Sequence, residues 1–258
     1  VGGGPAGMEF ARICAQRGHD VTLFEQSDAL GGMLRHANYP SFKWPLRQFM
    51  EYMIAQMDKE GVKVKLSTKA TPELLAQGGY EVLGLALGAE PSSLPLPGKD
   101  GANVGYAATV YGHEDSLGKN VTIIGGGEIG VETGLYLAEL GHLVTVLEMQ
   151  YDLILDAPHA HYRNMVVNYW RHTANFAYQA GVTCTAIDPD GVRYLDPDGN
   201  EKKQMADNVL LAIGMKSRSD EAMELAKAVP YSVVIGDCDK PGNVQKCMRA
   251  AFGAASQI

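Results

Sequence analysis

Short apolar segments alternate with amphipathic stretches along the chain. Apolar runs or alternating patterns predict strands that end at the turns near residues 125, 148, 88, 214 and 236, with further strands over 62–67, 181–187 and 191–204. Apolar positions at helical spacing predict a helix over about 45–60 and another from near Asn243. Strands that alternate with helices indicate an α/β fold.

Two segments of this pattern are near-copies of each other. Residues 1–10 read VGGGPAGMEF, and residues 123–132 read IIGGGEIGVE; each leads through a helical pattern to a second strand ending in glutamate. The first glycine and that glutamate lie 23 residues apart in both copies, Gly2 to Glu25 and Gly125 to Glu148. A single G-x-G-x-x-G is a weak signal, but the whole unit in register twice predicts two dinucleotide-binding folds.

Each part of this unit has a physical role in binding a dinucleotide. The first glycine permits a tight turn, the second allows backbone to approach a pyrophosphate, and the third lets the helix pack on the strand. The unpaired N–H groups at the helix N-terminus then hold the phosphates. Glu25 and Glu148 are placed to accept the ribose hydroxyls of an adenosine. Because a carboxylate repels a 2′-phosphate and no arginine follows Glu148 closely, the second copy favours NADH over NADPH.

The order of the remaining segments predicts that one domain is inserted in the other. Each half has the form of a dinucleotide fold followed by a β meander and a strand that stops at glycine, Gly88 or Gly214. The tail after residue 222 is too short for a domain, so we expect it to complete the first half. The expected domains are 1–103 with 223–258, and 104–222. Since only Val1 represents the buried first strand, we interpret the chain as a piece of a longer one.

Composition excludes several classes of protein and partner. A formal net charge of −8 without a Lys/Arg run argues against nucleic acid and anionic membranes as partners. No apolar stretch is long enough to span a membrane. The four cysteines form no C-x-x-C pair, which excludes a paired-thiol redox motif and is typical of reduced thiols in the cytoplasm.

These motifs carry a resemblance to a known family. The two glycine-rich units, LGGML at 30–34, IGDC at 235–238 and the tail GDCDKPGNVQKCMRAAFGAA resemble the C-terminal half of Old Yellow Enzyme-type NADH:flavin oxidoreductases. These include 2-enoate reductases, 2,4-dienoyl-CoA reductase, the bile-acid-inducible flavin oxidoreductases and trimethylamine dehydrogenase. The resemblance implies FAD on the first copy and NADH on the second. It also implies a preceding barrel domain with FMN and a four-iron cluster, which reduces an activated C=C bond.

The resemblance also implies roles for individual residues. The positions expected at the FAD are Gly2, Gly4, Pro5, Ala6, Gly7, Glu25, Gly32, Met33, Lys43, Ala86, Gly88, Gly236, Asp237, Asn243 and Val244. Among them, Asp237 would bind the ribityl hydroxyls, and the N–H groups of Asn243 and Val244 would face the flavin O2. The positions expected at the NADH are Gly125, Gly127, Glu128, Ile129, Gly130, Glu148, Ala212 and Gly214.

Glu132 resembles the family glutamate near the stacked rings, where it would position them; a solvated helix residue is the alternative. We expect an NADH:FAD electron-input module of an ene-reductase, able to form a homo-oligomer. Two other functions stay open: an NADH-dependent quinone or dye reductase, and a non-catalytic module that binds ADP. The pair His159 and His161 has no third ligand in view and indicates a surface loop rather than a metal site.

Overall fold

The computed structural model describes residues 1–155, 157 and 159–258, which form two compact units. Unit 1 comprises Val1–Asn38, Lys43–Glu90 and Met215–Ile258, and unit 2 comprises Tyr39–Phe42 and Pro91–Gly214. The second unit therefore lies, along the chain, between two parts of the first. No helix of the described residues is long and apolar enough to cross a membrane.

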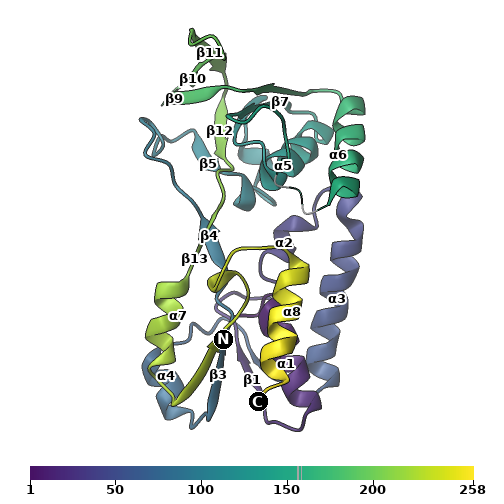
Figure 1. Ribbon diagram of the computed structural model, residues 1–258, viewed down its shortest axis with the longest axis vertical. Helices are drawn as coiled ribbons and strands as arrows, with labels where there is room; N and C mark the ends of the chain where they lie inside the picture. Colours follow the sequence, from purple (N-terminus) through teal and green to yellow (C-terminus); the bar gives the residue numbers. More distant parts are fainter. Residues whose placement is uncertain (156, 158) are drawn as a thin grey trace. The chain divides into compact units, whose positions relative to one another are not determined.

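Unit 1 is a set of parallel strands between two layers of helices (Figure 1). The parallel pairs are β1 with β2 and β3 with β14, and β4 pairs with β13. Helices α1, α3 and α8 pack together, and α4 packs with α7 against strands β3 and β14. The bounds are α1 Pro5–Gln16, β1 Thr22–Phe24, α2 Leu34–Ala37, α3 Trp44–Lys59, β2 Lys63–Lys65, α4 Pro72–Gln77, β3 Val82–Leu85, β4 Ala89–Pro91, β13 Met215–Ser217, α7 Ser219–Ala226, β14 Tyr231–Val234 and α8 Val244–Ala255.

Val1 and Gly2 occupy the place of a strand between β1 and β3. The Val1 nitrogen donates to Gly84 O at 2.7 Å, and the Val1 carbonyl accepts from Ala86 N at 2.8 Å. On the other side, Gly2 N donates to Phe24 O at 2.8 Å. These bonds join the two strand pairs in the order β2, β1, Val1–Gly2, β3, β14.

Unit 2 repeats this order with a complete central strand. Its parallel sheet runs β5-β12-β6-β7-β8, so that β6 has the place that Val1 and Gly2 have in unit 1. An antiparallel meander, β11-β10-β9, follows. The bounds are β5 Val104–Tyr106, β6 Asn120–Ile124, α5 Glu128–Glu139, β7 Leu143–Glu148, α6 Ala160–His172, β8 Phe176–Ala180, β9 Thr183–Asp188, β10 Gly191–Leu195, β11 Glu201–Met205 and β12 Asn208–Leu211.

The sheet of unit 2 has a buried core on each face. Val121 and Ile123 point to one face, where they pack with Leu135 of α5 and Trp170 of α6. The next residue, Ile124, points to the other face and joins the core that the meander covers. Both faces are apolar because successive side chains of a strand alternate between them, which explains the continuous apolar runs in the sequence.

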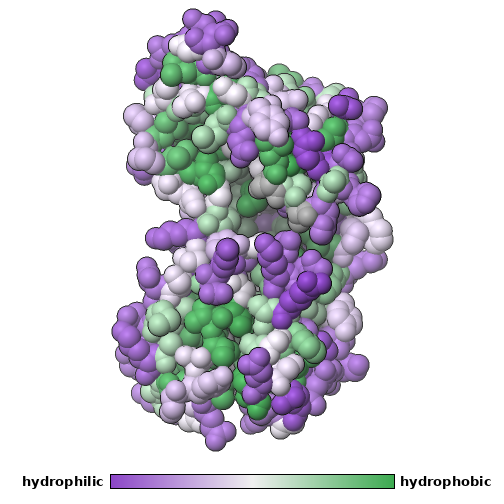
Figure 2. Space-filling model, in the orientation of Figure 1, coloured by the Kyte–Doolittle hydropathy of each residue, from purple (hydrophilic) through white to green (hydrophobic). Residues whose placement is uncertain are grey.

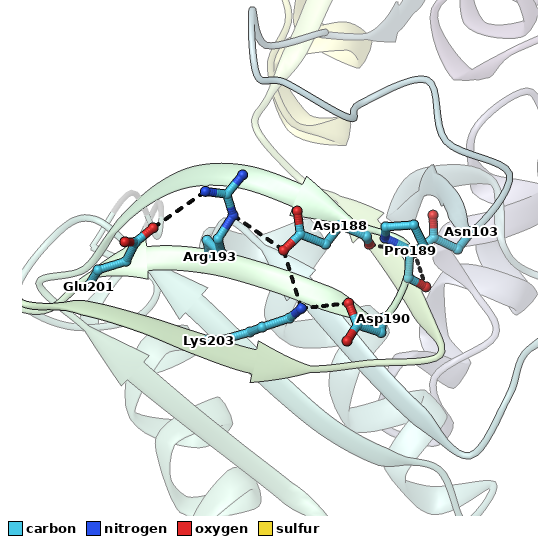
Figure 3. A network of polar contacts seen from close by, with 7 residues as sticks. All are labelled: Asn103, Asp188, Pro189, Asp190, Arg193, Glu201 and Lys203. Atoms are coloured by element: carbon cyan, nitrogen blue, oxygen red, sulfur yellow. Dashed lines mark hydrogen bonds and ion pairs between the residues drawn. The ribbon is translucent and has the colours of Figure 1, made fainter.

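An ion-pair network covers the outer side of the meander (Figure 3). Arg193 lies between Asp188 at 3.2 Å and Glu201 at 3.5 Å, and Lys203 reaches Asp188 at 3.2 Å and Asp190 at 2.6 Å. Opposite charges placed across neighbouring strands favour this strand register. The network is partly exposed, and its charges pair with one another across the strands of the meander. It therefore supports the pairing of these strands.

The units change earlier along the chain than the boundaries expected at 103 and 222. Leu94 and Leu96 pack against the meander-side core of unit 2, so the first change follows Glu90. Ala222 and Leu225 are buried in the core of unit 1, so the second change follows Gly214. The link rich in proline and glycine is thus already part of unit 2.

Two sequence expectations for local structure were wrong. The meander expected in the first half is not present among the described residues of unit 1, where helix α4 lies between β2 and β3. Thr71 caps this helix by accepting from Leu74 N at 3.2 Å, and Pro72 opens it. The loop expected at the histidine pair is the start of α6, with His159 as the N-cap and His161 in the first turn.

Candidate functional site

The glycine-rich turn of unit 1 is shaped by contacts that exclude any larger residue. Gly2 has a φ of +102°, and a Cβ there would stand 2.2 Å from Ala86 O. A Cβ on Gly7 would stand 1.8 Å from Gly2 O, because the first turn of α1 packs directly on the strand end. Gly2 is therefore required by its backbone conformation and by this close approach, and Gly7 by the close approach alone.

Unit 2 repeats these contacts closely. Gly125 has a φ of +108° and a Cβ there would stand 2.4 Å from Ala212 O, while a Cβ on Gly130 would stand 2.0 Å from Gly125 O. Ala86 and Ala212 lie near the ends of the strands that were predicted to stop at Gly88 and Gly214. They have the same role, since each presents its carbonyl to the first glycine of its turn.

Two glutamates, Glu25 directly after β1 and Glu148 at the end of β7, are hydrogen-bonded to these turns. Glu25 is 9% exposed, and its Oε2 accepts from Gly3 N at 2.7 Å while its Oε1 accepts from Ser27 N at 2.7 Å and Ser27 Oγ at 2.8 Å. Glu148 is 7% exposed, and it accepts from Gly126 N at 2.5 Å and from Gln150 N at 2.7 Å. Each carboxylate therefore fixes the middle of its glycine-rich turn.

The repeat extends beyond the glutamates, which the sequence did not reveal. Leu30 and Leu153 each follow the middle glycine by 27 residues and lie against it, so that a Cβ on Gly3 or Gly126 would meet the leucine Cδ2 at 2.5 or 2.4 Å. The next residues donate to the same glycines, Gly31 N to Gly3 O at 2.9 Å and Ile154 N to Gly126 O at 2.8 Å. Gly31 and Ile154 both have positive φ, which is rare for a β-branched residue such as Ile154. Because the two residue types differ, the match is not visible in the sequence.

Helices α1 and α5 both begin at the glycine-rich turns without a side-chain cap. Gly4 is the N-cap of α1 and Gly127 that of α5, and in neither case does a side chain of the described residues accept from the first turn. The N–H groups of the first turn and the positive end of the helix dipole thus point out of each glycine-rich turn. Glu128 opens α5, and Ile129 is partly buried against the core of unit 2.

A cleft in unit 1 gathers most of the residues predicted for FAD. The predicted residues that line it are Gly2, Gly4, Pro5, Ala6, Glu25, Gly32, Met33, Ala86, Gly88 and Asp237. Gly32 comes so close to the turn that a Cβ on it would stand 2.8 Å from Gly4 Cα. In Figure 2, apolar side chains gather around the N-terminal segment of this unit, among hydrophilic ones.

Other predicted residues lie outside this cleft lining. Gly7 and Gly236 are buried beside it, and a Cβ on Gly236 would stand 2.7 Å from Ala6 Cβ. Lys43 lies at the start of α3. Asn243 is the N-cap of α8, where its Oδ1 accepts from Lys246 N at 3.0 Å, and Val244 follows it.

The cleft also has lining residues that the sequence reasoning missed. They include Ser27, Arg35, Thr68, Lys69, Arg218, Glu221 and Cys247. Arg218 donates to Leu87 O at 3.1 Å and pairs with Glu221 at 2.5 Å, so it holds the segment that follows β3 in place. Ser27, Thr68, Lys69 and Arg218 follow strand ends, where ligands of open α/β sheets bind, and that position was the only signal for them. Arg35, Glu221 and Cys247 lie in helices and had no such signal.

In unit 2, Glu132 is buried rather than solvated. It is 6% exposed, and the Tyr162 hydroxyl of α6 donates to its Oε1. Its neighbour Thr133 is bonded to the Tyr111 hydroxyl at 2.8 Å, and burial raises the pKa of Tyr111. A buried carboxylate held by a phenol is a fixed group next to the glycine-rich turn of unit 2.

The cysteines of the described residues are free thiols. Burial raises the pKa of Cys184 to about 11, and the nearby Glu148 adds to the effect. Burial also raises the pKa of Cys247 to about 12, with Asp237 as the second cause. Both are neutral thiols at physiological pH and are not activated as nucleophiles.

Comparison with known proteins gives a consistent result. Residues 1–245 match the model of the family described as pyridine nucleotide-disulphide oxidoreductase. The chain is 33% identical to a cinnamate reductase of Clostridium sporogenes, over 100% of this chain and 38% of that enzyme. It is also 33% identical to an NADH oxidase of Thermoanaerobacter brockii, over 100% of this chain and 40% of that enzyme.

Solved structures include a 2-naphthoyl-CoA reductase in complex with 2-naphthoyl-CoA. It matches with a TM-score of 0.96 at 32% identity, over 100% of this chain and 39% of that one. The chain thus spans about 40% of the length of the relatives that it matches. These similarities confirm the predicted resemblance and the predicted α/β dinucleotide-binding fold. The chain belongs to the pyridine nucleotide-disulphide oxidoreductase family, whose domain binds FAD and NAD(P)H.

Proposed function

We propose that this chain is the electron-input module of a flavin-dependent ene-reductase, with FAD in unit 1 and NADH in unit 2. The observation that supports this most strongly is the repeated link between a buried glutamate and the middle glycine of a turn, Glu25 to Gly3 and Glu148 to Gly126. A protein with one nucleotide needs one such turn, and two point to a donor and an acceptor.

The residues of unit 1 fit FAD. The turn from Gly2 to Gly4 carries no Cβ, and α1 starts from it with N–H groups that no side chain of the described residues caps. A pyrophosphate accepts hydrogen bonds from such a helix start. Glu25 would hold the adenosine ribose, and Asp237 would hold the ribityl hydroxyls, since both line the same cleft.

The residues of unit 2 fit NADH. The turn from Gly125 to Gly127 repeats the uncapped helix start, and Gly130 lets α5 approach as closely as α1 does. Glu148 presents a buried carboxylate where NADPH would place its 2′-phosphate, and no arginine stands among residues 149–155. We therefore propose NADH, rather than NADPH, as the donor.

FAD, once bound, supplies a ring that accepts a hydride from the nicotinamide and passes electrons on singly. This transfer needs no acid or base from the protein, so the chain's task is to orient both rings and to exclude water. We assign Glu132 a positioning role in unit 2, because Tyr162 holds it and burial limits its motion.

The electrons leave this chain for an acceptor outside it. Its four cysteines include no C-x-x-C pair, and the two with the most strongly raised pKa, Cys184 and Cys247, are poor redox partners. Because cinnamate and 2-naphthoyl-CoA reductases are longer than this chain, we propose that an N-terminal barrel with FMN and a four-iron cluster receives the electrons. That domain would reduce a C=C bond conjugated to a carbonyl. The free thiols fit a cytoplasmic location.

An anaerobic titration of the full-length protein with NADH tests this function. We expect its flavin absorbance to bleach, with more than one NADH consumed per FAD because the proposed FMN and cluster also take up electrons, and a conjugated enoate to restore the oxidised spectrum. Binding of NADH without bleaching would support a module that holds ADP as a structural ligand. Reoxidation by a quinone but by no enoate would support a quinone reductase.

A further inference from the structure

Within the described part of the chain, Asp237 has two hydrogen-bond partners on one carboxylate oxygen and none on the other. Its Oδ1 accepts from Gly242 N at 3.0 Å and from Cys247 Sγ at 3.2 Å. Among the described residues, no hydrogen bond reaches Oδ2. The carboxylate lies in the FAD cleft of unit 1, so its orientation decides whether Oδ2 can serve a ligand there.

Cys247 lies one turn into α8 and is fixed by that helix. Its N–H donates to Asn243 O at 3.1 Å, and Ala251 and Ala255, further along α8, are fully buried. The thiol is partly buried and lines the same cleft as Asp237. Burial and the adjacent carboxylate keep this thiol protonated, so it stays a hydrogen-bond donor at neutral pH.

We propose that Cys247 is a positioning residue for FAD: its thiol and Gly242 N–H hold Oδ1 of Asp237, so that Oδ2 is presented to the ribityl hydroxyls. This inference rests on the proposed function, because it requires FAD in this cleft. It assigns to the thiol a role that is neither redox nor nucleophilic. The other donor to Oδ1 is the backbone N–H of Gly242. Cys247 is therefore the one side chain of the described residues that orients this carboxylate.

Substitutions at Cys247 in the full-length protein test the proposal. Cys247→Ala removes the donor, and we expect it to raise the Kd for FAD about threefold to tenfold, the effect of one lost hydrogen bond. Cys247→Ser keeps a donor and should stay within about twofold of the parent. Cys14→Ala is the matched control, because Cys14 is buried in α1 beside Ala255 and does not line the cleft. The Kd is measured by flavin fluorescence on protein stripped of FAD, with thermal unfolding in parallel.

A double-mutant cycle separates positioning from packing. In an Asp237→Ala background, Cys247→Ala should weaken FAD binding no further, because the thiol acts only through this carboxylate. The proposal is overturned if Cys247→Ala binds FAD like the parent, if Cys247→Ser is as weak as Cys247→Ala, or if the two losses add. Failure of the parent protein to bind FAD would instead contradict the proposed function, so the two failures are distinguishable.

Discussion

The side chain of Glu25 is bonded to the backbone of Gly3, with Oε2 accepting from the glycine N–H at 2.7 Å. Glu148 and Gly126 repeat this relationship in unit 2. Each carboxylate both fixes its turn and lies where the strand beside the nucleotide cradle ends. Loss of its charge should therefore affect nucleotide choice, while loss of the whole side chain should also affect folding.

Glu148→Gln keeps an oxygen that can accept from Gly126 N but removes the negative charge. We expect the KM for NADH to rise about threefold to tenfold, since a charged acceptor for the ribose hydroxyls is lost. The ratio of activities with NADPH and NADH should increase because repulsion of the 2′-phosphate is removed. Steady-state kinetics with both donors measures this. The matched variant Glu25→Gln should leave the NADPH to NADH ratio unchanged, and an equal change in both variants would contradict the assignment.

Gly125→Ala should be more destabilising than Gly141→Ala. Both glycines have positive φ, +108° and +97°, but a Cβ on Gly125 meets Ala212 O at 2.4 Å whereas Gly141 has open space. Gly141→Ala should therefore cost about 1 kcal/mol of conformational strain, and Gly125→Ala roughly 3 kcal/mol or more. Urea unfolding of each variant measures the difference. Equal losses would show that the close approach to Ala212 is not a real constraint.

Tyr162→Phe should slow the reduction of FAD by NADH. The change removes the hydroxyl that donates to Glu132 and leaves a buried carboxylate with one partner fewer. A loss of about tenfold in the rate is expected, the size of one hydrogen bond to a charged group. Tyr169→Phe is the control, because Tyr169 lies on the same helix and donates to a different carboxylate, Glu139. Rapid mixing gives both rates, and equal rates in the two variants would remove Glu132 from its positioning role.

Stability should decline at alkaline pH through two thiols. The pKa values of Cys184 and Cys247 in the folded state, about 11 and about 12, exceed the ordinary value of 9.0. The unfolded state therefore loses these protons first, so the stabilising effect is complete below pH 9 and is lost as the pH rises toward 11 and 12. Urea unfolding under reducing conditions measures the decline, and replacing both cysteines by serine should make it shallower. An unchanged decline would mean that other groups cause it.

The sequence predicted best where backbone geometry leaves no choice. The positive φ and the close approach at Gly2 and Gly125 admit only glycine, so the turns are visible as a repeated motif. Helix α3 was predicted over 45–60 and spans Trp44–Lys59, because its amphipathic pattern is long.

Other features were not predictable or were missed for identifiable reasons. Helix α4 is short, and its capping signals at Thr71 and Pro72 were missed. The match of Leu30 with Leu153 was hidden because Gly31 and Ile154, which follow them and donate to equivalent glycines, have dissimilar side chains. Cleft residues such as Arg218 and Cys247 follow no motif, and only the fold brings them together with the turn at Gly2.

Rapid mixing of the full-length, FAD-loaded protein with NADH, without oxygen, tests the central claim most directly. NADH with deuterium on nicotinamide C4 is used in a parallel reaction. The account predicts that the flavin bleaches in a single turnover and that deuterium slows the bleaching, because a hydride passes between nucleotides held by the two cradles. NADH that binds while the flavin stays oxidised would contradict it.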